Sequence, residues 1–400
     1  MKKKKIWLVE NIHTIAKEQL EKDGFEVELS SYAPSESELI EKLPHYQAVG
    51  IRSKTEITEK VLESNPHLLT IGCFCIGTNQ VKLKKANRLG IPVFNAPHSN
   101  TRSVAEMVLA EMIILSRKIG DKSMKAHKGD WDKIAVGSYE VRGKTLGIVG
   151  YGHIGSQLSV LAEGLGLKVI FYDIVKKLPL GNAQNVSSLN ELLAQSDFVS
   201  LHVPKTLQTE NMITNTEINK MKKGSYLINA SRGDVVVIEA LAEALKSKHL
   251  AGAAIDVFPS EPASNKEKFI SPLQGLENVL LTPHIGGSTE EAQYSIGLEV
   301  AESFRKFLRI GSTAGAVNFP NVDLPQRSGT SRILNVHRNE PGVLGEINSI
   351  ISEAKANIEA QYLSTDQNIG YLVAYIEGSQ AQDIAQKINL LSRNIRVRIL

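Results

Sequence analysis

The feature that most constrains the fold is a glycine-rich turn between a predicted strand and a predicted helix. The apolar run Leu146-Gly-Ile-Val-Gly150 reads as a short buried strand, and the turn Gly150-Tyr-Gly-His-Ile-Gly155 follows it directly. Asp173 then ends the next predicted strand, residues 168–173. A strand, a turn with three spaced glycines, a helix and an acidic residue closing the second strand are typical of a βαβ unit that binds a dinucleotide.

The three glycines of this turn and the acidic residue after it each have a physical role. Gly150 allows the tight turn, Gly152 lets the backbone approach a pyrophosphate, and Gly155 lets the helix pack closely on the strand. The phosphates would meet the amino end of the helix. Asp173 can accept hydrogen bonds from the ribose hydroxyls and would repel a 2′-phosphate, which favours NAD over NADP. The alternative is a glycine-rich turn in an unrelated α/β fold.

Two α/β series precede the C-terminal part of the 400-residue chain. Strands alternating with helical stretches predict parallel sheets covered on both faces. The first series has predicted strands at 6–10, 27–29, 48–52, 68–73 and 91–94. A helix is predicted over 103–119, with Val104, Val108, Met112 and Leu115 on one face. The second series has predicted strands at 144–150, 168–173, 198–203, 225–229, 251–257 and 279–282, and a helix over 289–308.

The C-terminal part follows a different pattern. Residues 319–330 combine glycine, proline and polar residues with little periodicity and predict a linker. Beyond it, the sequence predicts β-α-β-β-α-β, a ferredoxin-like arrangement. Its strands are predicted at 332–337, 359–365, 370–376 and 395–399, and its helices at 342–356 and 380–392.

Composition excludes several classes of function. The formal net charge is +3, and Lys2 to Lys5 supply four positive charges, so the rest of the chain is near −1 and no nucleic-acid-binding face is expected. The sequence contains no run of the roughly 18 apolar residues that a membrane span requires. Two cysteines argue against a disulfide framework and favour a reducing compartment. We therefore expect a cytoplasmic protein without a membrane partner.

Three candidate catalytic residues follow predicted strands of the second series. Arg232 follows Asn229-Ala-Ser231, Glu261 lies in Asp256-Val-Phe-Pro-Ser-Glu-Pro262, and His284 lies in Thr282-Pro-His-Ile-Gly-Gly287. Active-site crevices of open α/β sheets form outside the carboxyl ends of the strands. An imidazole can carry the proton that an alcohol loses on oxidation, a carboxylate can orient it, and a guanidinium can bind a substrate carboxylate in a bidentate manner. Taken singly, each residue also has a structural explanation: an ion pair, a loop charge and a turn histidine.

These motifs together resemble the D-isomer-specific 2-hydroxyacid dehydrogenases over almost the whole chain. The resemblance includes residues 51–55, 71–79 and 95–106 and the C-terminal part. It implies oxidation of 3-phospho-D-glycerate to 3-phosphohydroxypyruvate with NAD as cofactor, the first step of L-serine biosynthesis. It also leaves room for reduction of 2-oxoglutarate to 2-hydroxyglutarate.

The resemblance assigns roles to individual residues. It makes His284 the proton donor in reduction and the base in oxidation, with Glu261 orienting it and Arg232 holding the substrate carboxylate. Asp256 would accept a hydrogen bond from the nicotinamide carboxamide. The expected NAD contacts are Gly150, Gly152, His153, Ile154, Gly155, Asp173, Ala230, Ser231, Arg232, Asp256, His284, Ile285, Gly286 and Gly287.

Substrate contacts are also implied by the resemblance. They are Arg52, Ser53, Lys54, Asn100, Lys133 and Gln293. Lys54 stands where a second arginine is expected; it keeps the positive charge for a phosphate and loses the guanidinium fork. Trp131 and Lys133 match a stretch that relatives place near the active site of a neighbouring subunit, and a homotetramer is expected on the same ground.

The C-terminal part resembles an ACT domain, a small-molecule sensor, from the run His337-Arg-Asn-Glu-Pro-Gly342 onward. The resemblance implies L-serine as an effector that inhibits by feedback, with His337, Asn339 and Asn357 as ligands at a dimer interface. The alternative is a dimerisation module without a ligand. The linker has one glycine, Gly329, where relatives have a pair.

The expected architecture is α/β with three domains. Residues 1–99 and 287–328 form a flavodoxin-like substrate domain, residues 100–286 form an inserted Rossmann domain that binds the dinucleotide, and residues 329–400 form the ferredoxin-like ACT domain. No metal site is expected, because Cys73 and Cys75 alternate on a strand and lack clustered histidines. Two other functions stay open: a D-2-hydroxyacid dehydrogenase with another substrate, and a non-catalytic protein that senses NAD(H).

Overall fold

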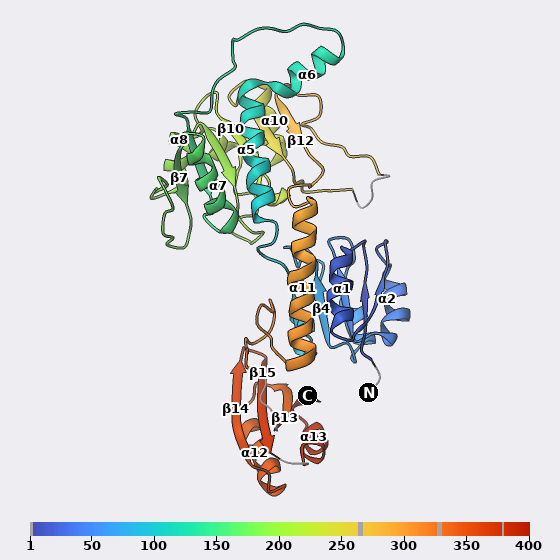
Figure 1. Cartoon of the computed structure of the whole chain (residues 1–400). Coiled ribbons are helices and arrows are strands. Elements are labelled where there is room, and N and C mark those ends of the chain that lie inside the picture. The colour runs from blue at the N-terminus through green and yellow to red at the C-terminus, as the bar shows by residue number, and fades with distance from the viewer. Residues whose placement is uncertain (1–2, 263–266, 326–329, 378–379) are drawn as a thin grey trace. The chain divides into compact units, whose positions relative to one another are not determined.

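The computed structural model describes residues 3–262, 267–325, 330–377 and 380–400. These residues form two compact units, one of residues 1–99 with 293–400 and one of residues 100–292. Figure 1 shows the helices and strands of both. Gly329, the glycine singled out in the predicted linker, lies outside the described residues.

The first unit contains a five-stranded parallel sheet. Its order is β2-β1-β3-β4-β5, which is the flavodoxin-like order. The strands are β1 (Lys5–Leu8), β2 (Glu26–Leu29), β3 (Ala48–Ile51), β4 (Thr70–Cys73) and β5 (Val93–Phe94). The helices among them are α1 (Thr14–Lys22), α2 (Glu36–Lys42), η1 (Leu43–His45), α3 (Glu59–Ser64) and α4 (Leu83–Arg88). The predicted fold of this part is confirmed.

Burial on both faces of this sheet explains why its central strands are apolar. Every residue of β3 and β4 is buried, as expected for strands covered on both faces. Helix α11 (Glu290–Ile310) supplies Ile296, Val300 and Phe304 to the core that contains Leu8 and Phe74. The last helix of the second α/β series thus completes the hydrophobic core of the first sheet.

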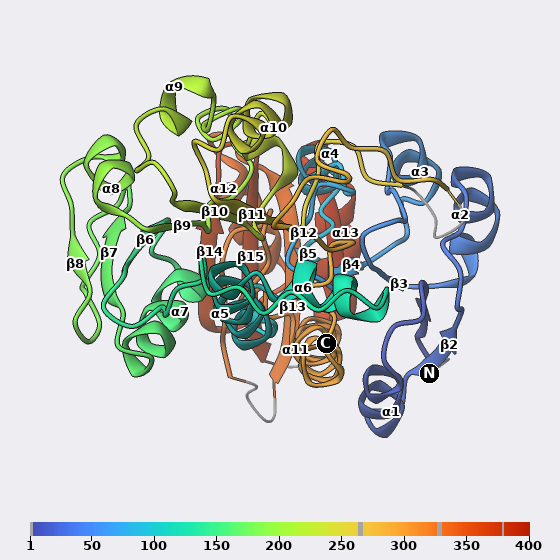
Figure 2. The ribbon, with the colours of Figure 1, turned by 90° about the horizontal axis from the view of Figure 1, so that it is seen from above.

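The second unit contains a seven-stranded parallel sheet of order β12-β11-β10-β9-β6-β7-β8, which Figure 2 shows from β8 across to β12. The order reverses at β6, as in Rossmann folds, so the predicted fold is confirmed. The strands are β6 (Thr145–Val149), β7 (Lys168–Tyr172), β8 (Gln184–Asn185), β9 (Phe198–Leu201), β10 (Tyr226–Asn229), β11 (Gly252–Ile255) and β12 (Val279–Leu281).

The helices of this unit pack on both faces of the sheet. They are α5 (Thr101–Arg117), α6 (Ile119–His127), α7 (His153–Gly164), α8 (Leu189–Gln195), α9 (Asn215–Ile218), η2 (Gly233–Val235) and α10 (Ile238–Lys246). The predicted face of α5 is buried, because Val104, Val108 and Met112 lie in the core with β6. The predicted helix 103–119 is wrong at its end, since Lys118 has a left-handed φ of 51° that separates α5 from α6.

The C-terminal part forms a four-stranded antiparallel sheet of order β14-β15-β13-β16. Its elements follow the predicted sequence β-α-β-β-α-β. They are β13 (Thr330–Arg338), α12 (Val343–Glu353), β14 (Ile358–Thr365), β15 (Ile369–Glu377), α13 (Ala381–Asn389) and β16 (Asn394–Ile399). The ferredoxin-like prediction is confirmed.

The predicted linker has no helix or strand over residues 319–325, as expected, but two of its side chains are buried. Phe319 and Val322 are buried in one core cluster with Leu334 and Tyr371 of the C-terminal sheet. The rings of Phe319 and Tyr371 meet edge to face, with centroids 5.6 Å apart. Apolar side chains within an aperiodic segment can thus anchor it to a neighbouring sheet, which a search for periodicity misses.

Three further observations concern membranes, cysteines and metals. Within the described residues, every helix is too short or too polar to span a bilayer. Cys73 is buried and Cys75 half-buried, and neither forms a disulfide. The described part of the chain contains no group of three or more His, Cys, Asp or Glu side chains placed to hold a metal ion.

Candidate active site

The dinucleotide turn connects β6 to α7 at the point where the order of the seven strands reverses. Gly150 has a φ of +91°, and a Cβ there would lie 2.4 Å from the carbonyl oxygen of His202, just after β9. A Cβ at Gly155 would lie 2.3 Å from the carbonyl oxygen of Gly150. Both contacts are far too short, so the backbone geometry requires glycine at these two positions.

Gly152 differs from its neighbours, because a Cβ there would meet nothing within 4 Å. It is the N-cap residue of α7, which begins at His153, and no side chain caps this end of the helix. Open space beside the first amides of the helix and the positive end of the helix dipole fits a pyrophosphate.

Asp173 lies beside this turn and holds it. Its Oδ2 accepts a hydrogen bond from the Tyr151 amide at 2.8 Å, and its Oδ1 accepts one from the Val175 amide at 2.8 Å. These contacts fix the carboxylate next to the glycine turn, where the remaining lone pairs can meet ribose hydroxyls.

Alanine at Gly152 and alanine at Gly155 should therefore have different consequences. We expect Gly152→Ala to leave the melting temperature within about 2 °C and to weaken NADH binding more than tenfold, because the methyl group fills only the ligand's space. Gly155→Ala should lower the melting temperature, since its methyl group would overlap the Gly150 carbonyl. Thermal unfolding and NADH fluorescence titration measure both effects, and equal losses of stability in the two variants would contradict this description.

His284 and Glu261 form a hydrogen-bonded pair. The His284 Nδ1 lies 2.9 Å from Glu261 Oε2 and 3.1 Å from Oε1, and Oε1 also accepts from the Phe258 amide at 3.1 Å. His284 has a left-handed backbone with φ 55°, in the turn after β12. With Nδ1 directed at the carboxylate, Nε2 is the ring nitrogen available to a substrate.

The electrostatics of this pair suit proton transfer. The hydrogen bond and the charge of Glu261 raise the pKa of His284 above its ordinary value, against the opposing effects of burial and of Arg232. Burial acts to raise the pKa of Glu261, but the hydrogen bond and charge of His284 outweigh it and lower that pKa. An ionised carboxylate therefore stabilises the protonated imidazole.

Arg232 lies after β10 in a turn built by Asn229. The Asn229 side chain accepts from the Ser231 amide and hydroxyl at 3.1 and 2.8 Å and donates to the Arg232 carbonyl at 2.9 Å. A Cβ at Gly233 would lie 2.0 Å from the Phe258 carbonyl carbon, so this turn packs directly on the segment that leads to Glu261. The Arg232 guanidinium affects the pKa values of both His284 and Glu261.

Asp256, at the end of β11, organises the turn that carries His284. It is only 2% exposed. Its Oδ1 accepts from the Thr282 hydroxyl at 2.6 Å and the Ile285 amide at 2.8 Å, and its Oδ2 accepts from the Gly286 amide at 2.9 Å. These bonds give Asp256 a positioning role, and its predicted contact with the nicotinamide carboxamide stays a prediction.

The candidate residues therefore gather on the carboxyl ends of neighbouring strands. Arg232, Glu261 and His284 follow β10, β11 and β12, which are adjacent in the sheet. The remaining expected NAD contacts follow β6, β7, β10 and β12 of the same sheet, at Ala230, Ser231, Gly287 and the positions described above. The arrangement brings an acid–base pair and a guanidinium to the carboxyl ends of the strands, where a dinucleotide is expected to bind.

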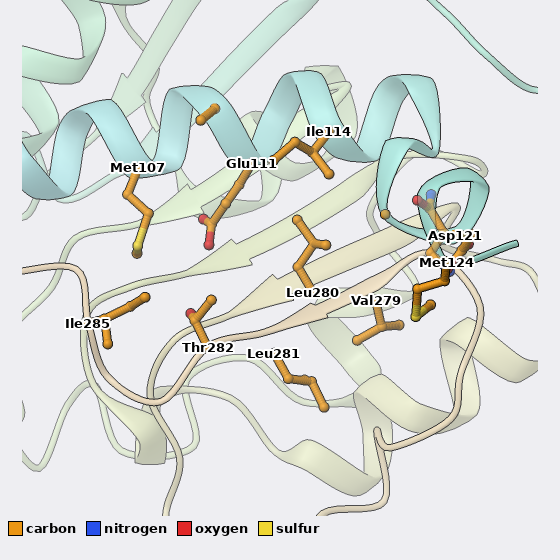
Figure 3. A pocket seen from close by; sticks show the side chains of 13 residues that line it. Met107, Glu111, Ile114, Asp121, Met124, Val279, Leu280, Leu281, Thr282 and Ile285 are labelled. Atoms are coloured by element: carbon orange, nitrogen blue, oxygen red, sulfur yellow. The ribbon is translucent and has the colours of Figure 1, made fainter. Parts of the chain in front are cut away.

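A pocket of about 420 Å³ lies beside this edge, between α5, α6 and β12 (Figure 3). Its lining is mostly apolar and includes Met107, Leu280, Ile285 and the carboxyl group of Glu111. Burial raises the pKa of Glu111 to about 8, with a smaller contribution from Asp256. Among the described residues, neither carboxyl oxygen of Glu111 has a hydrogen-bond partner. Glu111 is therefore mostly protonated at neutral pH. The pocket is separate from the candidate catalytic residues, because Arg232, Glu261 and His284 do not line it.

The predicted substrate residues are divided between the two compact units. Arg52, Ser53 and Lys54 form the turn after β3, with Arg52 half-buried and the other two exposed, and Gln293 belongs to the same unit. Asn100 and Lys133 belong to the other unit. Asn100 precedes α5 and contacts Gly287, and Lys133 is exposed in the segment that follows α6, near Trp131, which is 87% exposed.

The predicted effector residues lie on the C-terminal sheet. His337 is 3% exposed, and its Nδ1 is 2.8 Å from the Asn335 amide oxygen. Asn339 donates to the Asp366 carbonyl at 2.7 Å. Asn357 directly precedes β14, which β15 separates from β13 in the sheet. His337 and Asn339 thus lie at the end of β13, and Asn357 lies just before the edge strand β14, two strands away in the sheet.

Asn229, Thr282 and Glu111 were not predicted as functional residues. Asn229 ends the buried strand β10, and Thr282 directly follows β12. Both lie within motifs already identified, and a polar residue at the end of a predicted strand was the available signal. Glu111 lies inside an amphipathic helix pattern, and nothing in the sequence indicates that its carboxyl group is buried.

Comparisons with known proteins match this arrangement. Residues 109–286 match the family described as D-isomer specific 2-hydroxyacid dehydrogenase, NAD binding domain, and residues 333–396 match an ACT domain like that of the AHAS small subunit. The D-3-phosphoglycerate dehydrogenases of Dictyostelium discoideum and Escherichia coli K12 are each 53% identical over 99% of this chain and 97% of their own length.

Solved structures show the same fold. The D-lactate dehydrogenase of Aquifex aeolicus, complexed with NAD and lactic acid, has a TM-score of 0.69 and 26% identity over 79% of this chain and 100% of its own. The NAD-binding match confirms the predicted cofactor, and the C-terminal match confirms the predicted ACT domain. The chain belongs to the D-isomer specific 2-hydroxyacid dehydrogenase family and is similar over its whole length to D-3-phosphoglycerate dehydrogenases.

Proposed function

We propose that this chain oxidises 3-phospho-D-glycerate to 3-phosphohydroxypyruvate with reduction of NAD⁺ to NADH. The observation that carries the proposal is the His284–Glu261 pair, at 2.9 Å, next to Arg232 on adjacent strand ends of an NAD-binding sheet. The naming of the similar D-3-phosphoglycerate dehydrogenases supports the choice of substrate.

In this mechanism NAD⁺ supplies the hydride acceptor, and the chain's own residues orient the substrate and move its proton. Arg232 holds the substrate carboxylate with its guanidinium fork. His284 Nε2 accepts the proton of the C2 hydroxyl while hydride leaves C2. Glu261 stabilises the imidazolium that forms, as its effect on the pKa of His284 requires. In the reverse direction the same imidazolium returns its proton to the carbonyl oxygen.

The turn after β3 is proposed to bind the phosphate. Arg52 can bind a phosphate through two guanidinium nitrogens, and Lys54 and Ser53 add a positive charge and a hydroxyl group. Asn100, Lys133 and Gln293 complete the proposed set of substrate contacts. Activity with 2-oxoglutarate, a tetrameric assembly and a cytoplasmic location remain part of this proposal.

The C-terminal sheet is proposed to bind L-serine at an interface between two copies of the chain. The match to an ACT domain supports an amino acid as effector. Asn339 and Asn357 carry amide groups that pair with amino-acid carboxylate and ammonium groups. Burial lowers the pKa of His337, which favours the neutral form of its imidazole. Serine would act by restraining motion between domains.

The test is the initial rate of NADH formation with 3-phospho-D-glycerate, D-glycerate and D-lactate, each with and without L-serine. We expect the phosphorylated substrate to be preferred and serine at millimolar concentration to slow the reaction. A preference for an unphosphorylated acid would indicate another D-2-hydroxyacid dehydrogenase. Tight NADH binding without turnover of any substrate would indicate an NAD(H) sensor.

Glu261→Gln should change the pH dependence of this reaction. His284 must be unprotonated to act as base, so kcat/KM for oxidation rises with pH through its pKa. Since Glu261 raises that pKa, its replacement should move the acid limb toward lower pH. We also expect kcat to fall roughly tenfold to a hundredfold through loss of orientation. Rate profiles from pH 5 to 10 measure both effects, and an acid limb that stays in place would contradict the assigned pairing.

A further inference from the structure

Glu10 is a buried carboxylate that the proposed mechanism does not use. It lies two residues after β1, and only 8% of it is exposed. The amide of Glu10 donates to the Tyr32 carbonyl at 3.0 Å, which fixes its backbone at the carboxyl end of the five-stranded sheet. Strand β1 pairs with β3, so Glu10 is next to the turn that follows β3.

The Glu10 carboxylate accepts three main-chain hydrogen bonds from that turn. Its Oε1 accepts from the Arg52 amide at 2.9 Å and the Thr55 amide at 2.8 Å, and its Oε2 accepts from the Lys54 amide at 3.0 Å. From the other side, the Gln80 side chain donates to the Arg52 carbonyl at 2.7 Å. The backbone of this turn is therefore held from both sides by side chains.

The backbone of Glu10 is itself strained. Its φ is +60° and that of Asn11 is +55°, in the left-handed region that disfavours residues with a Cβ. Such strain persists where the surrounding contacts enforce it, and it concentrates at functional sites. Here the backbone is held by the main-chain hydrogen bonds of Glu10 to Tyr32 and of Asn11 to Ser30, and the side chain by its three hydrogen bonds from the turn.

This geometry determines how the turn can meet a phosphate. Successive main-chain amides in a turn form a nest that binds anions, and phosphate sites commonly use one. In this turn the amides of Arg52, Lys54 and Thr55 already serve the Glu10 carboxylate. An incoming phosphate is thus directed to the side chains of Arg52, Ser53 and Lys54, of which Ser53 and Lys54 are exposed.

We infer that Glu10 is a positioning residue for the phosphate subsite. Its carboxylate occupies the amide nest of residues 52–55, and the side chains of this turn are thereby presented to the substrate phosphate. The inference rests on the proposed function, because it takes the phosphate of 3-phospho-D-glycerate as the ligand of this turn. It adds a residue that touches no substrate and that sets the preference for a phosphorylated acid.

The test compares 3-phospho-D-glycerate with D-glycerate, which lacks only the phosphate. In Glu10→Gln an NH₂ group faces at least one backbone amide, and in Glu10→Ala both acceptor oxygens and all three hydrogen bonds are lost. The ratio of the kcat/KM values for the two substrates should fall about tenfold in the glutamine variant and about a hundredfold in the alanine variant. The change should lie in KM for the phosphorylated substrate, with kcat within about threefold and KM for NAD⁺ unchanged, as for an interaction equal in ground and transition states.

Two further variants guard against a general loss of folding. Gln80→Ala releases the same turn from its other side and should lower the ratio about fivefold. Thr70→Val is the matched control, because it removes a buried hydrogen bond of 2.9 Å to the Pro92 carbonyl in the same sheet. It should leave the ratio unchanged even where it lowers the melting temperature.

The outcomes separate the inference from the proposed function. If the unmodified chain does not prefer 3-phospho-D-glycerate, the proposed function fails. If it does, and the Glu10 variants keep the wild-type ratio or lower both kcat/KM values equally, the proposed function stands and the inference is overturned. A lower KM for the phosphorylated substrate in Glu10→Ala would also overturn it, since the freed amides would then bind the phosphate better than the side chains do.

Discussion

Replacing His284 by alanine should lower kcat for 3-phospho-D-glycerate oxidation about 10²- to 10⁴-fold, the usual contribution of a positioned general base. The imidazole is held by Glu261 at 2.9 Å, and its left-handed turn is anchored by the bonds of Asp256 to Ile285 and Gly286. The substitution removes the proton acceptor and leaves those anchors in place. NADH affinity should consequently stay within about twofold of the wild-type value.

Steady-state kinetics and NADH fluorescence titration measure these two quantities in the same preparation. His45→Ala is the matched control, since His45 is exposed and lies in the other compact unit. It should leave both quantities unchanged. Turnover near the wild-type rate in His284→Ala would require a different base and would remove the central assignment.

Replacing Arg232 by alanine should lower kcat/KM about 10³-fold, because two charge-assisted hydrogen bonds to the substrate carboxylate are worth about 2 kcal/mol each. Arg232→Lys should recover only part of this loss, since an ammonium group keeps the charge and lacks the planar fork. The turn should survive both changes, because the Asn229 side chain holds it through the main chain of Arg232 and Ser231.

The control for Arg232 is Arg102→Ala, which removes an exposed guanidinium paired with Glu106 on α5. Its effect on kcat/KM should be less than twofold, as for other surface ion pairs. An Arg232→Ala variant that keeps the wild-type KM and kcat would show that the substrate carboxylate binds elsewhere.

The sequence was sufficient to predict both parallel sheets and the C-terminal sheet, because local patterns determine them. The glycine turn could be explained residue by residue: Gly150 and Gly155 are required by close backbone contacts, and Gly152 borders open space. Strand ends carried the polar residues of the site, so Arg232, Glu261 and His284 could be named from their positions. Their distances could not, because they depend on the order of β10, β11 and β12 in space.

Other features depend on contacts between distant parts of the chain. Asp256 was predicted to meet the cofactor, yet its carboxylate also anchors the 282–286 turn, about 30 residues away. Glu10 and the turn at 52–55 are more than 40 residues apart, and no local pattern indicates their three hydrogen bonds. The burial of Phe319 could not be predicted from the aperiodic segment around it, because its partner Tyr371 belongs to a later strand.

The account depends on a hydride that leaves C2 of a D-configured acid while His284 takes the hydroxyl proton. The direct measurement uses 3-phospho-D-glycerate with deuterium at C2 and NAD⁺, followed by mass spectrometry and NMR of the NADH formed. We predict one deuterium per NADH at the nicotinamide C4 from the D isomer, and no NADH from the L isomer. NADH that carries no deuterium, or equal turnover of both isomers, would contradict the proposed reaction.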